Sequence, residues 1–184
     1  YYAYNELLKK KNFTDWMSEG ERNLDSELIS SFSDEIMPTD KRFYSYIITI
    51  TGHGQYSYRK SLEPYYEKLS EYGLKIDSTK DFSDLDNSFI TYVATTLEVD
   101  KMIGTLYEEL ENRNLLDNTV ITLFGDHNCY YQGLSNYVKK IPENFRDQSY
   151  NYPFLYNVPY IMRVPQLKGQ VIDKYSCTSD IVPS

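Results

Sequence analysis

Apolar residues recur along this chain at two different periods, and together they predict alternating strands and helices. A continuous aromatic and β-branched run over residues 43–51 predicts a buried central strand, because it lacks the alternation of a half-exposed strand. A similar run predicts a second buried strand over 119–124, and a shorter one is expected over 160–164. Between the first two, residues 88–112 carry apolar side chains at steps of three or four, which predicts a long helix. Strand, helix and strand in this order predict an α/β fold with a parallel sheet covered by helices.

Shorter helices are expected on the N-terminal side of this unit. Residues 25–36 hold apolar side chains at helical spacing, and Pro38 follows as a stop signal. Residues 61–72 predict a second short helix, and the spacing of Tyr4, Leu7 and Leu8 predicts another at the start of the chain.

Composition and charge narrow the class of protein. The 184 residues suffice for one domain, and a hydrophobic content of 41% allows a packed core and excludes a disordered chain. With 19 Lys and Arg against 27 Asp and Glu, the net charge is −8. This acidic balance argues against a nucleic-acid partner, because phosphate binding needs clustered basic side chains.

The ends of the chain and its cysteines bear on its context. No apolar run is long enough to span a membrane. The chain starts at Tyr1 rather than Met and reaches Ser184 without a stop signal, so we expect an excised piece of a longer protein. Cys129 and Cys177 lack metal-type spacing. Two ordinary thiols are the favoured interpretation, and one disulfide between them stays open.

Both histidines of the chain directly follow predicted buried strands. His53 lies between two glycines after the first strand, and His127 follows the second. Ligands of open α/β sheets bind at the carboxyl ends of the strands, so both side chains are predicted at one site. The alternative is that each histidine only caps backbone groups at a strand end.

The adjacent pair of Asp126 and His127 predicts a divalent metal, because carboxylate oxygen and imidazole nitrogen together suit Zn²⁺ or Mn²⁺. Neighbouring strand residues face opposite sides, so both can reach one ion only if the chain curls after the strand, which Gly125 facilitates. The alternative is an Asp-His hydrogen bond at a turn. Two ligands are too few, so further ligands must come from elsewhere.

At these positions the chain resembles the sulfatase and alkaline-phosphatase-like superfamily, and within it the lipoteichoic acid synthase group of phosphoglycerol transferases. The resemblance is carried by residues 92–106, 117–121 and 124–127, in that order. The strand that ends before Gly52-His53 resembles the group's strand ending in Ser-His or Asn-His. Two later segments, 159–165 and 179–184, resemble the strand and the helix start that follow the group's metal-binding Asp-His pair.

The resemblance implies a fold and a domain assignment. It implies a three-layer α/β/α sandwich around a mainly parallel sheet. Residues 1–184 would form the C-terminal portion of a single sulfatase-like catalytic domain, truncated on its N-terminal side.

The resemblance also assigns roles to residues. Asp126 and His127 would be two ligands of one catalytic divalent ion, with Mn²⁺ the first expectation and Zn²⁺, Mg²⁺ or Ca²⁺ as alternatives. His53 would contact the substrate's phosphate or leaving oxygen, as a hydrogen-bond donor or a general acid. Arg22 is a candidate phosphate contact, although a solvated arginine is the more common outcome. The group's threonine nucleophile lies upstream of the matched part, so we expect these 184 residues alone to be inactive.

The implied function is phosphoglycerol transfer from an anionic membrane glycerophospholipid to a cell-envelope polymer such as lipoteichoic acid. The implied place is the extracellular face of a bacterial cell membrane, held there by segments outside this chain. One alternative is a sulfatase- or phosphatase-type hydrolase of the same superfamily. A second is a non-catalytic domain that has kept the fold and binds a cell-wall polymer or a protein.

Overall fold

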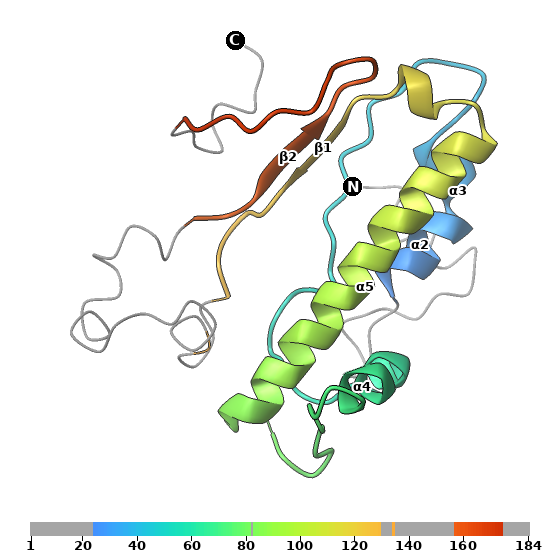
Figure 1. Cartoon of the computed structure of the whole chain (residues 1–184). Helices are drawn as coiled ribbons and strands as arrows, with labels where there is room; N and C mark the ends of the chain where they lie inside the picture. The colour runs from blue at the N-terminus through green and yellow to red at the C-terminus, as the bar shows by residue number, and fades with distance from the viewer. Residues whose placement is uncertain (1–23, 82, 130–133, 135–156, 175–184) are drawn as a thin grey trace.

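One long helix organises the part of the chain that the computed structural model describes, which is residues 24–81, 83–129, 134 and 157–174. Helix α5 runs over Leu85–Asn112, 28 residues, and the other elements pack along it (Figure 1). Asp84 caps its start, since the carboxylate accepts a 2.9 Å hydrogen bond from the Asn87 amide. The helix confirms the prediction for 88–112 and begins three residues earlier, because this cap lies upstream of the apolar repeat.

Two short helices lie against α5 on the N-terminal side of the chain. Helix α2 covers Asp25–Ser31 and helix α3 covers Ser33–Ile36. They confirm the helix predicted over 25–36, with a break at Phe32, whose φ of −115° departs from helical geometry. Figure 1 shows α2 and α3 side by side with the C-terminal half of α5, and α2 makes the more extensive contact.

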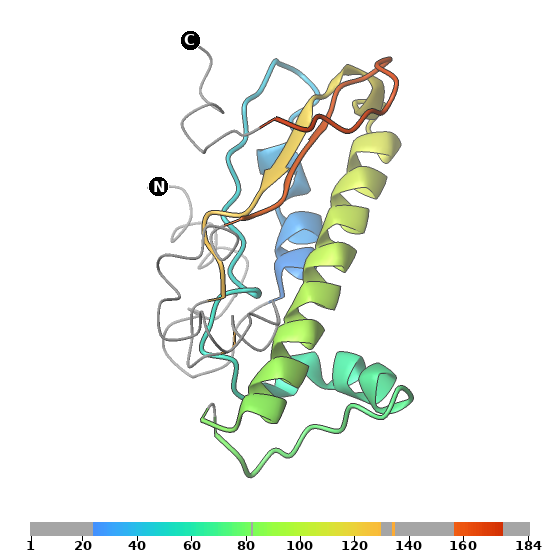
Figure 2. The ribbon, with the colours of Figure 1, turned by 60° about the vertical axis from the view of Figure 1, so that its left-hand side comes forward.

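Helix α4 crosses the N-terminal end of α5 (Figure 2). A 3₁₀ turn, η1, covers Lys60–Leu62 and continues into α4 at Glu63–Ser70, which confirms the helix predicted over 61–72. Pro64 occupies the first turn of α4, where its missing N–H leaves no helical hydrogen bond unmade.

Two apolar clusters form along α5 and together make up most of the described core. One lies where α2, α3 and the end of α5 meet β1, and the other lies where α4 crosses α5. The buried members of the first are Ile29, Met37, Met102, Leu110 and Ile121, and those of the second are Leu62, Tyr66, Leu69, Ile90 and Ala94.

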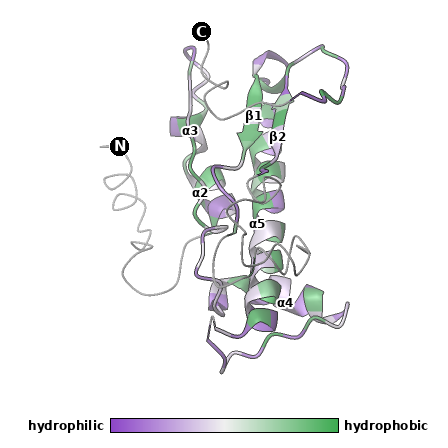
Figure 3. Ribbon diagram, turned by 90° about the vertical axis from the view of Figure 1, so that its left-hand side faces the viewer, coloured by the Kyte–Doolittle hydropathy of each residue, from purple (hydrophilic) through white to green (hydrophobic). Residues whose placement is uncertain are grey.

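The described sheet has two strands, β1 over Ile121–Phe124 and β2 over Tyr160–Arg163. They confirm the strands predicted over 119–124 and 160–164, and they pair antiparallel, with Ile121 opposite Arg163 and Phe124 opposite Tyr160. A 3₁₀ turn, η2, at Leu116–Asn118 joins α5 to β1. Figure 3 shows apolar ribbon along both strands. Two antiparallel strands do not test the sandwich around a mainly parallel sheet, which stays a prediction.

The prediction of a buried central strand over 43–51 is wrong for the described structure. These residues form no strand, and Tyr44 and Ile48 are 89% and 56% exposed. The segment runs beside β1, with the Tyr46 and Phe124 rings 6.4 Å apart, but it forms no ladder with β1 (Figure 1). A strand is defined by hydrogen bonds to a neighbour, and apolar composition alone does not supply that neighbour.

The helix expected around Tyr4, Leu7 and Leu8 lies outside the described residues. Within the described residues, no helix combines the length and apolar character needed to cross a lipid bilayer.

Gly125 follows β1 at a point where a side chain would press against Val158. A Cβ at Gly125 would lie 3.0 Å from the Cβ of Val158, so we expect Gly125→Ala to lower the free energy of unfolding by about 1–3 kcal/mol. Gly104 is the matched control, because a Cβ there meets nothing within 4 Å and the position is helical. Gly104→Ala should raise the free energy of unfolding by roughly 0.5–1 kcal/mol. Urea denaturation of the two variants, followed by circular dichroism, measures both changes, and equal effects would contradict the crowding.

Candidate functional site

The two histidines lie side by side although 74 positions separate them in the sequence. The ring centroids of His53 and His127 are 6.4 Å apart, and the rings stand nearly perpendicular at 88°. His53 lies in the turn after the extended segment 43–51, and His127 lies in the bend after β1. The structure therefore brings together the two side chains that sequence analysis singled out.

Asp126 and His127 form a pair in the bend after β1. Asp126 Oδ1 accepts a 2.9 Å hydrogen bond from the His127 amide, and Asp126 Oδ2 lies 3.7 Å from His127 Nε2. His127 Nδ1 lies 2.7 Å from the Asn128 carbonyl oxygen, which can only accept, so Nδ1 is the donor. In the neutral ring, Nε2 then carries the lone pair that a metal ion needs.

These donors fit one divalent cation as a partial ligand set. Two ligands of a tetrahedral zinc-type site, each about 2.1 Å from the ion, lie about 3.4 Å apart. The 3.7 Å between Asp126 Oδ2 and His127 Nε2 is close to that separation. Across the residues that the structure describes, His, Cys, Asp and Glu form no group of three or more that could hold a metal ion. Asp126 and His127 can therefore hold an ion only together with ligands from elsewhere.

The His53 ring is oriented by its own loop. Its Nδ1 lies 2.5 Å from the Gly54 carbonyl oxygen, which can only accept, so Nδ1 is the donor. The His53 amide donates a 3.0 Å hydrogen bond to the Ile50 carbonyl, which closes the turn. A protonated His53 can donate from Nε2 to a negatively charged oxygen.

The buried carboxylate of Asp25 accepts hydrogen bonds from the backbone just before His53. Asp25, 4% exposed at the start of α2, accepts hydrogen bonds from the Ile50 amide at 3.1 Å and from the Thr51 amide at 2.8 Å. The Thr51 hydroxyl in turn accepts a 3.1 Å hydrogen bond from the Asp25 amide. Burial raises the pKa of the Asp25 carboxyl above its ordinary value, and these hydrogen bonds offset only part of that rise.

A second buried carboxylate, that of Glu98, lies on α5. Glu98 has no exposed surface, and its Oε1 accepts a 2.8 Å hydrogen bond from the Ser26 amide. Its Oε2 accepts a hydrogen bond from the Tyr65 hydroxyl. Burial, together with this hydrogen bond to Glu98, raises the pKa of Tyr65, so its hydroxyl stays protonated and keeps donating.

Sequence analysis missed both carboxylates, although one of them left a signal. Glu98 occupies the same helical row as Ile90, Ala94 and Met102, spaced by four residues, and a charged residue in an apolar row requires a buried partner. Asp25 carried no comparable signal, because an acidic residue at a helix start usually only caps the helix.

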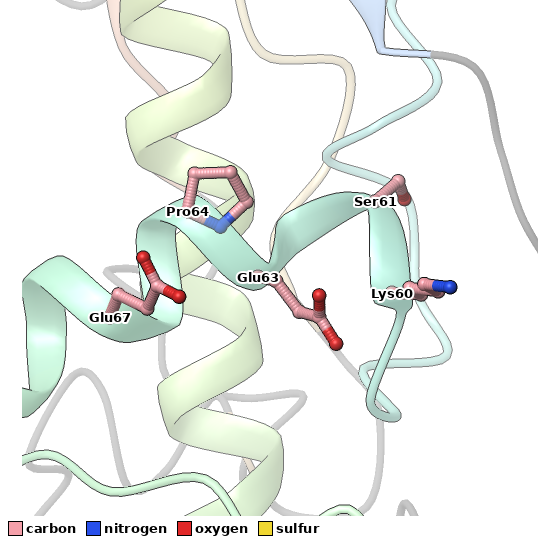
Figure 4. A pocket seen from close by; sticks show the side chains of 5 residues that line it. All are labelled: Lys60, Ser61, Glu63, Pro64 and Glu67. Carbon is pink, nitrogen blue, oxygen red and sulfur yellow. The ribbon is translucent and has the colours of Figure 1, made fainter.

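Several other residues with ionisable or nucleophilic side chains lie outside the described residues or are buried. Arg22 and Cys177 lie outside the described residues. Thr51 is 1% exposed with its hydroxyl engaged by Asp25, so it is not placed to act as a nucleophile. Cys129 is buried in a small cluster with Tyr56 and Leu134. An open hollow along η1 and the first turns of α4 includes neither histidine in its lining, which consists of Lys60, Ser61, Glu63, Pro64 and Glu67 (Figure 4).

Comparison with known protein families finds a match along the entire chain. The family model described as Sulfatase matches residues 1–184. No solved structure matches the chain significantly.

Curated relatives point in the same direction. The chain is 31% identical over 145 residues to lipoteichoic acid synthase 1 of Bacillus subtilis (strain 168), which covers 77% of this chain and 20% of that protein. It is 24% identical over 166 residues to lipoteichoic acid synthase of Staphylococcus saprophyticus, covering 87% of this chain and 22% of that protein. The match to the Staphylococcus aureus (strain USA300) enzyme is 25% over 149 residues, covering 77% and 20%. The chain thus spans about a fifth of the length of these relatives.

The raised pKa of Asp25 predicts a specific pH dependence of stability. The folded chain holds a proton at Asp25 more tightly than the unfolded chain, whose value is near 3.8, and the nearby charge of Glu98 adds to the rise. The contribution of Asp25 to the free energy of unfolding should therefore fall as pH rises from the unfolded pKa through the higher folded pKa. Urea denaturation between about pH 4 and pH 7 should show the wild-type chain losing stability relative to Asp25→Asn.

Asp77 provides a control of opposite sign. Hydrogen bonds from the Thr79 hydroxyl and amide lower the pKa of the exposed Asp77 carboxyl. Its contribution is present above the unfolded pKa and is lost as pH falls, so wild type should gain stability relative to Asp77→Asn as pH rises. If the difference in free energy of unfolding between wild type and variant changed with pH in the same direction for Asp25→Asn and Asp77→Asn, the assignment of Asp25 would be contradicted.

Proposed function

Because this chain belongs to the sulfatase family, we propose that it is part of a metal-dependent phosphoglycerol transferase acting on an anionic membrane glycerophospholipid. The observation that carries the proposal is the approach of His53 to His127 beside Asp126, which groups a phosphate-oxygen donor with two metal ligands. The similarity to three lipoteichoic acid synthases supports a phosphoglycerol donor and a cell-envelope polymer as product.

Each of the three residues has a separate task in this proposal. Asp126 and His127 hold one divalent ion, Mn²⁺ in the first instance, together with ligands from outside the described residues. That ion, when bound, supplies Lewis-acid stabilisation of charge on the transferred phosphoryl oxygens. His53, protonated at Nε2, donates to the phosphate or to the leaving glycerolipid oxygen as negative charge develops there.

The nucleophile of the reaction comes from elsewhere in the intact protein. We expect a threonine that accepts the phosphoglycerol group and then passes it to the polymer. Thr51, the threonine nearest His53 in the sequence, is buried and bonded to Asp25, which supports an external nucleophile.

The negative charge of the chain favours binding of the lipid head group by a few specific groups rather than by a basic surface. A net charge of −8 offers no basic surface to attract an anionic head group from a distance. The head group would be held by the ion and by donors such as His53. Such an enzyme would work at the extracellular face of a bacterial membrane, anchored by segments outside this chain.

A hydrolase is the alternative favoured by the description of the family model itself. A hydrolase would pass the ester group to water rather than to a glycerol hydroxyl. The two activities differ in product: a transferase elongates a glycerol phosphate polymer, and a hydrolase releases a free anion.

We expect His127→Gln and Asp126→Asn, made in the intact protein that contains this chain, to lower phosphoglycerol transfer on the order of 100-fold or more. Each substitution removes one ligand of an ion worth several kcal/mol of transition-state stabilisation. Vesicles of phosphatidylglycerol serve as substrate, diacylglycerol release and polymer length are measured, and bound manganese is determined by elemental analysis. Both variants should also lose bound metal.

Asp100→Asn is the matched control, since Asp100 is exposed on α5 and at least 27 positions from either histidine. It should retain activity and metal. Full activity and metal content in both site variants would overturn the metal assignment. Release of a free anion without polymer growth would replace the transferase with the hydrolase, and no metal and no turnover in wild type would indicate a binding domain.

A further inference from the structure

We propose that Asp25 and Arg59 are positioning residues that hold the His53 turn from both sides and thereby aim the His53 ring at the substrate phosphate. The inference rests on the proposed function, in which His53 donates to the phosphate. It adds two residues that touch neither substrate nor metal in that scheme and act through His53.

Arg59 donates hydrogen bonds to two carbonyl oxygens of the turn that carries His53. Its Nη1 donates to the Thr51 carbonyl at 2.9 Å and its Nη2 donates to the His53 carbonyl at 3.0 Å. The guanidinium is rigid and planar, so two donors on one group fix the separation and direction of two carbonyls two residues apart. Arg59 is 3% exposed, so water does not compete strongly for these hydrogen bonds.

Asp25 binds the same turn through two of the turn's backbone amides. The carboxylate accepts from Ile50 and Thr51, and the Thr51 hydroxyl accepts from the Asp25 amide. The amides of residues 50 and 51 are therefore held by a carboxylate, and the carbonyls of residues 51 and 53 by a guanidinium. With both sets of hydrogen bonds in place, the backbone that carries the His53 ring has little freedom to rotate.

The anchor at Asp25 is itself fixed by two other helices. The neighbouring Ser26 amide donates to Glu98 on α5, and Glu98 also accepts from Tyr65 on α4. Helices α2, α4 and α5 therefore meet at these buried oxygens. The position of His53 is coupled in this way to the packing of the three helices rather than to its own loop alone.

The energetic balance at Asp25 favours a functional role over a stabilising one. Its pKa is raised although its carboxylate accepts hydrogen bonds from two amides, so burying the ionised group is a net cost to folding. A charge that is costly to bury and lies one turn from a reacting side chain is typical of functional sites.

Precise aim matters for a donor of this kind. A hydrogen-bond donor stabilises developing charge only when it is already directed at the oxygen, and a displacement of about 1 Å can cost on the order of 100-fold in rate. Asp25→Asn replaces one carboxylate oxygen with an amide donor that faces the backbone donors at 50 and 51. Arg59→Lys keeps the charge but loses the two-point grip.

The first test uses kinetics of the intact protein on phosphatidylglycerol vesicles. Asp25→Asn and Arg59→Lys should lower kcat about 10- to 100-fold, with KM changed less than about threefold and bound manganese unchanged. In a His53→Ala background, Asp25→Asn should lower kcat no further, because its effect passes through His53. Losses that multiply in the double variant, or a variant that keeps full kcat, would overturn the proposal.

The second test reads the position of His53 without any activity. In the intact protein, labelling every histidine with ¹³C at Cε1 produces one signal for each histidine, and His53→Gln identifies the His53 signal by its loss. Asp25→Asn should displace or split the His53 signal, whereas Asp77→Asn, which removes an exposed carboxylate in the segment before α5, should leave it in place. If Asp25→Asn fails to fold by circular dichroism, Arg59→Lys decides the question by the same signal. A His53 signal that stays in place in a folded variant would overturn positioning, whereas a wild-type protein without transferase activity would overturn only the proposed function.

Discussion

The hydrogen bond from the Ser26 amide to the buried carboxylate of Glu98 joins helix α2 to helix α5, and the site geometry depends on it. The two residues are 72 positions apart, so this contact closes a long loop whose entropic cost must be offset by the packing around it. Once α2 is fixed on α5, Asp25 faces the turn before His53. The placement of a candidate phosphate donor thus follows from an interaction in the interior of the helical layer.

The polar contacts lie between two apolar clusters, and this arrangement makes them rigid. On α5, Glu98 is flanked one turn away by Met102 of the first cluster and by Ala94 of the second cluster. Both neighbours are buried, so water has little access to the carboxylate. In such a low-dielectric setting hydrogen bonds strengthen, and an unmatched polar group becomes costly. The network is therefore expected to break as a unit rather than bond by bond.

The outer side of the structure has the opposite character. Tyr44 and Ile48 of the extended segment, and Ile161 of β2, expose large apolar surfaces. Exposed apolar side chains on neighbouring extended segments are unusual for a surface that faces water. The chain also spans about a fifth of the length of the relatives it matches. The described residues combine a well-anchored helical layer with a sheet region that is largely uncovered.

The sequence by itself was sufficient for most of the local elements and for nominating the two histidines that the structure places side by side. Apolar spacing located α5, α4 and both strands of the sheet, since helical and extended periods follow from backbone geometry alone. The positions of His53 and His127 after apolar runs were enough to nominate a shared site, and their rings lie 6.4 Å apart.

Tertiary structure alone decided which apolar run forms a ladder and which charges are buried. The segment 43–51 has a strand's composition but no hydrogen-bonded neighbour in the described residues, because pairing depends on distant backbone that composition does not encode. In the same way, the roles of Asp25, Arg59 and Glu98 arise from partners 6 to 72 positions away. Local periodicity reports which face of an element is apolar, whereas the partner of a buried charge is known only once the elements have packed.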